Sequence, residues 1–236
     1  MITGIKNIVS KNKVVKRVVY SLFVPTYRKW LDRKKNKQFL SGGHEALDAF
    51  YRAAKEADVP CWLSFGTLLG AIRNGGFIRH DNDIDIGAWH FSYSADFEKI
   101  LRKYDFEKIL QIEVNQGCYA LEQSWKYKNV KVDIFYHFER EDKMYCHAFY
   151  YESPEKQLQL GGEMKVLEMT FSNTGFSEFL FEGIKVLVPM DSKKYLIEQY
   201  GEDYMIPQKK WDYTQDPCNM RLIQEEIGIV TLTENI

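Results

Sequence analysis

The sequence feature that most restricts the fold is an acidic run in which Asp81, Asp83 and Asp85 recur at every second position. Ile84 and Ile86 occupy alternate positions, which is typical of a strand with one buried face. In such a strand the three aspartates share the opposite face, where their charges repel one another. A hard divalent cation removes this repulsion, so the run predicts a strand that carries a metal site.

The acidic run allows two other interpretations. The spacing of the aspartates also begins a calcium-binding loop, but Ile86 stands where that loop needs glycine and Ser92 where it needs glutamate. A solvated turn is the second alternative, and the alternating isoleucines argue against it. The strand interpretation is therefore favoured.

A further acidic residue, Asp133, lies within residues 130–136, a run rich in β-branched and aromatic side chains that predicts another strand. An unpaired charge in the middle of such a strand is costly. If the two strands are neighbours, Asp133 joins Asp83 and Asp85, with Asp81 close by. These carboxylates would hold one or two Mg²⁺ (or Mn²⁺) ions, an arrangement that suits phosphoryl or nucleotidyl transfer.

Gly66 and Thr67 follow a short apolar run and precede a helical pattern that ends at Asn74. A strand, a glycine turn and a helix N-terminus together present backbone N–H groups that can bind phosphate. Arg73, near the end of that helix, could reach the same phosphate, and a surface salt bridge is the alternative.

Several polar or aromatic residues are weaker candidates for substrate contacts. His80 stands beside the acidic run, either as a catalytic group or as an ion-pair partner. Lys126 precedes the Asp133 strand and either contacts a phosphate or is a solvated loop lysine. Tyr200 and Trp211 could form one wall of a nucleotide pocket, with core packing as the alternative. Lys209 and Lys210 are candidates for the same wall.

The net charge of −1 conceals an uneven distribution of charge along the chain. Residues 1–37 contain eleven Lys or Arg and one acid, a charge of +10, and the remainder carries −11. Valines at 14, 15, 18 and 19 predict a basic amphipathic helix over residues 10–24 that ends at Pro25. Such a helix lies at a membrane surface or packs on protein. Nucleic acid is a less favoured partner, because the apolar face of this helix carries valines rather than aromatics that stack on bases.

The segment 62–73, together with Gly76-Phe77-Ile78 and the acidic run at 81–86, resembles the LicD family. Val132-Asp133-Ile134-Phe135 is similar to the third-aspartate strand of that family, and Tyr200-Gly201 with Pro207 is similar to its C-terminal segment. The resemblance covers roughly residues 43–211. Arg79-His80 departs from the Pro-Trp that is common in the family, and Asn82 stands where Asp is common.

The resemblance implies an α+β fold in which a nucleotidyltransferase-like mixed β-sheet is flanked by helices. It implies a domain over residues 39–236 that follows a basic arm at 1–38. The implied activity is transfer of a phospho-alcohol (phosphocholine, glycerol phosphate, ribitol phosphate or similar) from a CDP-activated donor to a hydroxyl of a cell-surface glycan, with release of CMP. The expected location is cytoplasmic and peripheral on the membrane, through residues 1–37.

In this family Asp83, Asp85 and Asp133 correspond to the metal-binding acids, and Gly66 and Thr67 to the phosphate turn. Two other functions remain open. A nucleotidyltransferase would use the same acids to move a nucleoside monophosphate and release pyrophosphate. A non-catalytic scaffold of a glycan assembly complex would bind neither metal nor CDP.

Overall fold

The computed structural model describes residues 13–153, 161–208 and 211–233, and within them the side chains of 33, 34 and 36 onward. The helices are α2 (Lys13–Glu56), α3 (Phe65–Asn74), α4 (Ala95–Lys103) and α6 (Ser192–Tyr200), with a 3₁₀ turn, η1, at His90–Ser92. The strands are β1 (Cys61–Leu63), β2 (Asp83–Trp89), β3 (Phe106–Val114), β4 (Ala120–Tyr127), β5 (Val130–Arg140), β6 (Lys143–Tyr150), β7 (Gly162–Ser172), β8 (Phe176–Phe181), β9 (Ile184–Pro189) and β10 (Met220–Leu232).

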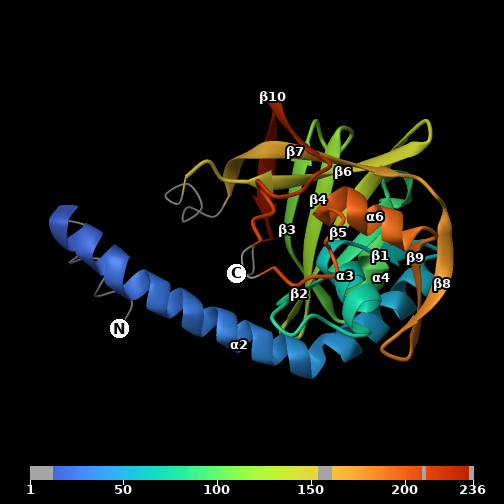
Figure 1. Cartoon of the computed structure of the whole chain (residues 1–236), viewed down its shortest axis with the longest axis horizontal. Helices are drawn as coiled ribbons and strands as arrows, with labels where there is room; N and C mark the ends of the chain where they lie inside the picture. The colour runs from blue at the N-terminus through green and yellow to red at the C-terminus, as the bar shows by residue number, and fades with distance from the viewer. Residues whose placement is uncertain (1–12, 154–160, 209–210, 234–236) are drawn as a thin grey trace.

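The ten strands form one mixed sheet in the order β4-β3-β10-β7-β6-β5-β2-β1-β9-β8. β4 also pairs with β5, so six strands close into a ring from which β2, β1, β9 and β8 extend. Helices α3 and α6 pack against each other and against β2, β7 and β9, whereas α2 and α4 pack against β5 and β3 (Figure 1). This architecture confirms the predicted α+β class.

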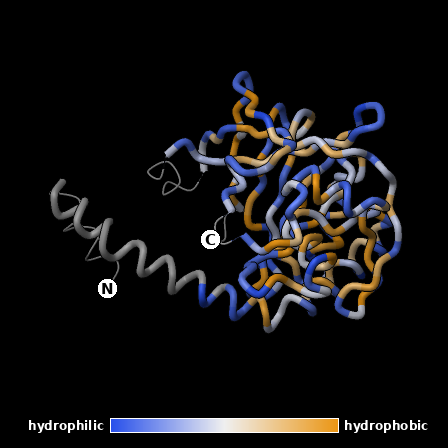
Figure 2. Tube along the Cα trace, viewed as in Figure 1, coloured by the Kyte–Doolittle hydropathy of each residue, from blue (hydrophilic) through white to orange (hydrophobic). Residues whose placement is uncertain are grey.

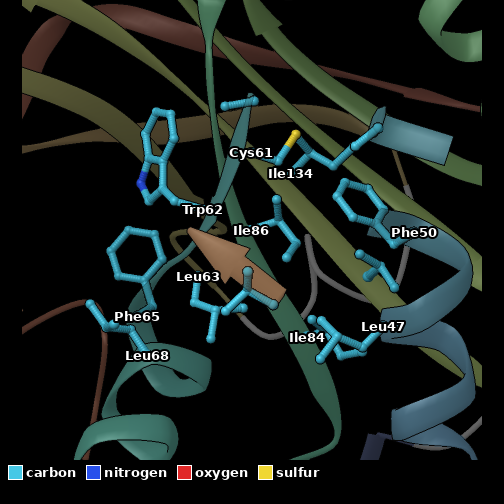
Figure 3. Close-up of a cluster of buried hydrophobic side chains, with 14 of the residues drawn as sticks. Leu47, Phe50, Cys61, Trp62, Leu63, Phe65, Leu68, Ile84, Ile86 and Ile134 are labelled. Carbon is cyan, nitrogen blue, oxygen red and sulfur yellow. The ribbon is translucent and has the colours of Figure 1, made fainter. Parts of the chain in front are cut away.

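The sheet is held in place by an apolar core on the face that α2 covers. Leu47 and Phe50 of α2 lie beside Ile84 and Ile86 of β2 and Ile134 of β5, all fully buried (Figure 3). Apolar segments gather inside the body of the molecule, and the loops at its rim are mainly polar (Figure 2). Because strand side chains alternate, burial of the isoleucines turns the intervening aspartates to the opposite face.

The predicted helix end at Pro25 is wrong. α2 passes through this position and ends at Glu56. A proline has a helical φ, but it removes one N–H donor and its ring crowds the carbonyl four residues earlier, so a helix can continue through it only at a cost in stability. The apolar face predicted for residues 14–22 lies outside the described side chains, and the division at residue 38 falls within α2 and stays a prediction.

Two strands are not predicted from the sequence pattern: β8 (Phe176–Phe181) and β10 (Met220–Leu232). β10 pairs with β7 and β3 over its length, with a register shift between Ile223 and Ile227. Such an irregularity breaks the period-two pattern that identifies a strand. Within the part of the chain that the structure describes, none of the helices is both long enough and apolar enough to cross a membrane.

Candidate metal and phosphate site

The acidic site forms where the parallel strands β2 and β5 lie side by side. Asp85 is directly opposite Asp133, and Asp83 is directly opposite Lys131. Carboxylate oxygens of Asp83, Asp85 and Asp133 all lie within 4.8 Å of one another. The two predicted acidic strands are therefore neighbours, and they bring the three acids together on one face.

Ser64 and the first turn of α3 fix the position of Asp85. Its backbone N–H donates to Thr67 Oγ1 at 2.8 Å, its backbone carbonyl accepts from Ser64 N–H at 3.1 Å, and its Oδ2 accepts from Gly66 N–H at 3.0 Å. A Cβ at Gly66 would lie 3.2 Å from that Oδ2. A side chain at this position would therefore press on the carboxylate, and glycine lets the helix N-terminus approach it without that crowding.

The same turn contains a strained residue. Phe65, the first residue of α3, has a φ of 41°, which bulky side chains rarely adopt. Its ring packs edge-on against Phe135, with ring centroids 4.6 Å apart. Strain of this kind persists only where the surrounding contacts enforce it, and it gathers at functional sites.

Asp133 is the most buried of the three acids, with a side chain that is 5% exposed. Its Oδ1 accepts from Ser124 Oγ at 2.5 Å, and its Oδ2 lies 2.7 Å from the ammonium of Lys131. The same ammonium is 3.4 Å from Asp83 Oδ2. Hydrogen bonds and one cation thus hold the carboxylate within the sheet, where an unpaired charge would be costly.

Burial and mutual repulsion make these carboxylates hard to ionise. Burial, with the charge of Asp83, raises the pKa of Asp81 to about 7. Burial, with the charge of Asp133, raises the pKa of Glu122 on β4 to about 8. Burial also raises the pKa of Asp85 and of Asp133. A bound divalent cation would offset the repulsion between these carboxylates and favour their ionised form.

The chemistry of the donor set fits a hard divalent ion. Asp83, Asp85 and Asp133 supply only carboxylate oxygens, the ligands that Mg²⁺ and Mn²⁺ prefer. Among the described residues, no histidine or cysteine belongs to this group. The residues present therefore fit the predicted cofactor class, and they do not distinguish between the two ions.

Two cavities meet at this site. The larger, of about 350 Å³, is lined by the three acids together with Lys131 and Glu122, and by a group of mainly apolar and aromatic residues: Phe65, Phe135, Ala148, Phe149, Met169, Gln199 and Tyr213. The smaller, of about 120 Å³, contains Arg73, His80 and Asp81. Both cavities share Gly66, Tyr200 and Trp211. The rings of Tyr200 and Trp211 lie 4.7 Å apart, so this pair forms a common wall.

Four of the predicted site residues lie beside the three candidate metal-binding acids and are not part of that group. Asp81, Arg73 and His80 lie in the smaller cavity, and Arg73 donates to the backbone carbonyl of Tyr204 at 3.3 Å. Thr67 is buried, and its hydroxyl accepts from the backbone of Asp85, so the proposed phosphate contact of this residue stays a prediction.

Lys126 is not brought to the acidic site. Its ammonium pairs with Glu107 at 3.3 Å, and its side chain lines a separate groove beside β3. Lys209 and Lys210 lie outside the described residues.

Sequence reasoning missed Lys131, Glu122 and Ser124 as members of this site. Lys131 precedes Asp133 by two residues on one strand, so the alternation of side chains could have placed it on the same face. Glu122 and Ser124 come from β4, and no local signal in the sequence shows that β4 pairs with β5.

Comparison with known proteins adds a family and two relatives. The family model described as LicD/FKTN/FKRP, nucleotidyltransferase domain, matches residues 58–191. The chain is 32% identical to the mouse (Mus musculus) ribitol-5-phosphate transferase FKTN over 184 residues, which cover 78% of this chain and 37% of that protein. It is 30% identical to the human (Homo sapiens) protein of the same name, with the same coverage. The match thus spans well under half of the length of these relatives.

Proposed function

This chain belongs to the LicD/FKTN/FKRP nucleotidyltransferase domain family, and we propose that it is a metal-dependent phosphotransferase. The proposed reaction moves a phospho-alcohol group from a CDP-activated donor to a glycan hydroxyl and releases CMP. The observation that carries the proposal is the convergence of Asp83, Asp85 and Asp133 on one face of β2 and β5, beside a cavity large enough for a ligand.

The three aspartates would hold Mg²⁺ or Mn²⁺, which when bound neutralises the negative charge of the diphosphate and of the leaving group. Gly66 N–H and Thr67 Oγ1 keep Asp85 fixed, and Ser124 keeps Asp133 fixed. The protein therefore positions its ligating groups before the substrate arrives, and such preorganisation is the main contribution that a phosphotransferase makes.

We propose that the nucleotide binds in the larger cavity, and the support is its aromatic residues. Phe149, Tyr213 and Trp211 offer faces on which a cytosine ring can stack. The smaller cavity, with Arg73 and His80, then remains for the other substrate. Arg73 is half-buried next to Asp81, and one N–H group of its guanidinium is bonded to Tyr204.

Glu122 is a candidate for the base that takes the proton of the acceptor hydroxyl. It lines the larger cavity, and among the described residues no hydrogen bond or ion pair occupies its carboxylate. A pKa of about 8, raised by burial and by Asp133, is close to the range that suits proton transfer near neutral pH.

The transferred alcohol is proposed from the relatives. Both bear the name ribitol-5-phosphate transferase, so CDP-ribitol is the first donor to test, with CDP-glycerol and CDP-choline beside it. Each donor is incubated with the protein, Mg²⁺ and candidate glycans, and the products are separated. Release of CMP with transfer of the alcohol phosphate supports the proposal, and release of pyrophosphate would show a nucleotidyltransferase instead.

The decisive variant is Asp83→Asn, which removes one charge and keeps the shape of the side chain. We expect the rate of CMP release to fall by at least about a hundredfold, because the charge that holds the cation is lost. The unfolding temperature should remain near that of the wild type, since Asp83 is partly exposed at the start of β2. Near-full activity of Asp83→Asn would refute the metal-dependent mechanism.

The basic arm gives a second, separable proposal: residues 1–37 attach the protein to an anionic membrane surface that carries the acceptor glycan. Its support is the charge of +10 in this segment. Co-sedimentation with vesicles containing anionic lipid, with and without residues 1–37, tests it. Equal binding of both forms would exclude the arm as the attachment.

A further inference from the structure

We propose that Lys131 is a tethered cation that competes with the divalent ion for Asp83 and Asp133 and thereby sets the metal affinity of the site. This inference rests on the metal site of the proposed function. It assigns to Lys131 a role in controlling that site, in addition to any contact with substrate.

The position of the ammonium carries the argument. It lies 2.7 Å from Asp133 Oδ2 and 3.4 Å from Asp83 Oδ2, which is between two of the three carboxylates that a metal would use. The backbone enforces this position, because Lys131 is opposite Asp83 across β2 and β5 and two residues before Asp133 on the same face. A divalent ion and an ammonium therefore need the same oxygens.

The charges around the larger cavity show why a cation is placed there. Four acids line it: Asp83, Asp85, Asp133 and Glu122. Lys131 is the only Lys, Arg or His among the described residues that line it. The ammonium therefore reduces the mutual repulsion of these carboxylates, and its removal would leave the cluster without a positive charge.

The lysine also has room to leave. Its side chain is 44% exposed, whereas that of Asp133 is 5% exposed. Displacement of the ammonium from Asp133 therefore moves a flexible chain toward the cavity and leaves the sheet unchanged. In the cavity the ammonium can pair with the phosphate of a donor, so metal and donor would strengthen one another's binding.

The test is a titration with Mn²⁺ alone, in which the electron paramagnetic resonance signal of the free ion gives the dissociation constant. Lys131→Met keeps the length of the chain and removes the charge. We expect this variant to bind Mn²⁺ roughly tenfold more tightly than the wild type. In the wild type the ion must first break the charged hydrogen bond between Lys131 and Asp133, and in the variant that bond does not exist. In a chelator its unfolding temperature should be lower than that of the wild type.

Two further variants complete the test. Lys131→Arg keeps the positive charge, so its Mn²⁺ affinity should stay within about threefold of the wild type. Lys185 on β9 forms an ion pair with Glu178 on β8, at 3.3 Å, away from the acidic site. Lys185→Met removes this lysine and should leave the Mn²⁺ affinity unchanged. Unchanged or weaker Mn²⁺ binding by Lys131→Met would overturn the inference and leave the metal site itself intact. If neither the wild type nor Lys131→Met bound Mn²⁺, the metal site of the proposed function would fall as well.

Discussion

Thr67→Val tests whether the first turn of α3 builds the metal site. Valine has the shape of threonine and lacks the hydroxyl, so the change removes one acceptor from a side chain that is 1% exposed. The group that loses its partner is the backbone N–H of Asp85, which donates to Thr67 Oγ1 at 2.8 Å. β1 pairs with β2 only from Ile86 onward, so Thr67 takes the place of a strand partner for Asp85.

The magnitude follows from leaving one donor unsatisfied. A part-buried N–H that loses its hydrogen bond costs about 1–3 kcal/mol in the free energy of unfolding. For a chain of this size, each kcal/mol corresponds to a shift of about 2–4 °C in unfolding temperature. The backbone of Asp85 also loses a restraint, and loss of a group that orients a metal ligand typically weakens metal affinity about 10- to 100-fold.

The assay pairs Thr67→Val with Thr67→Ser, and both are measured by thermal unfolding and by Mn²⁺ titration. Serine keeps the hydroxyl and loses a buried methyl group, so it is expected to be less stable by about 1 kcal/mol and to keep its metal affinity. Only the valine variant should lose both stability and affinity. If the two variants bound Mn²⁺ equally well, the hydroxyl would not be orienting Asp85, and the reasoning would be refuted.

Three further predictions concern the same site. In Gly66→Ala the new Cβ lies 3.2 Å from Asp85 Oδ2 and 3.4 Å from Asp81 Oδ2, so Mn²⁺ affinity should fall at least about tenfold with the circular dichroism spectrum unchanged. Burial and Asp83 raise the pKa of Asp81 from 3.8 to about 7, so between these pH values the folded state holds a proton that the unfolded state has lost. In a chelator the unfolding temperature should therefore decrease as the pH rises from about 4 to about 7. Asp81→Asn should make this decrease shallower, and an unchanged slope would contradict the prediction. Trp211→Ala should weaken CMP binding by about tenfold, measured by calorimetry, and leave Mn²⁺ binding as it is.

The aspartates of the site could be predicted because strand alternation is a local rule. The isoleucines at 84 and 86 specify a buried face, and that alone turns Asp83 and Asp85 to the other face. Asp133 was predicted in the same way, from the apolar residues on either side of it. The remaining assumption, that the two strands are neighbours, is confirmed by the register in which Asp85 is opposite Asp133.

The rest of the site depends on pairings that no local pattern contains. Glu122 and Ser124 reach the site only because β4 pairs with β5 in antiparallel register. The ring closes through β10, which lies between β3 and β7 and is separated from both by many residues. Long-range pairing of this kind is set by the whole fold, so the walls of the larger cavity could not be predicted from the sequence.

The fold explains why a cluster of like charges can be tolerated on β5. That strand is paired with β2 and β4 along the segment that carries Asp133, and its other face buries Val132 and Ile134 completely. A strand held on both edges and on one face cannot move away from the repulsion of the carboxylates, whereas an edge strand could. The repulsion must then be relieved by Lys131, by a metal ion or by protonation of the carboxylates, whose pKa values are raised. Because β5 is held in this way, we expect cation binding at this site to raise the unfolding temperature, and the size of that rise would measure occupancy.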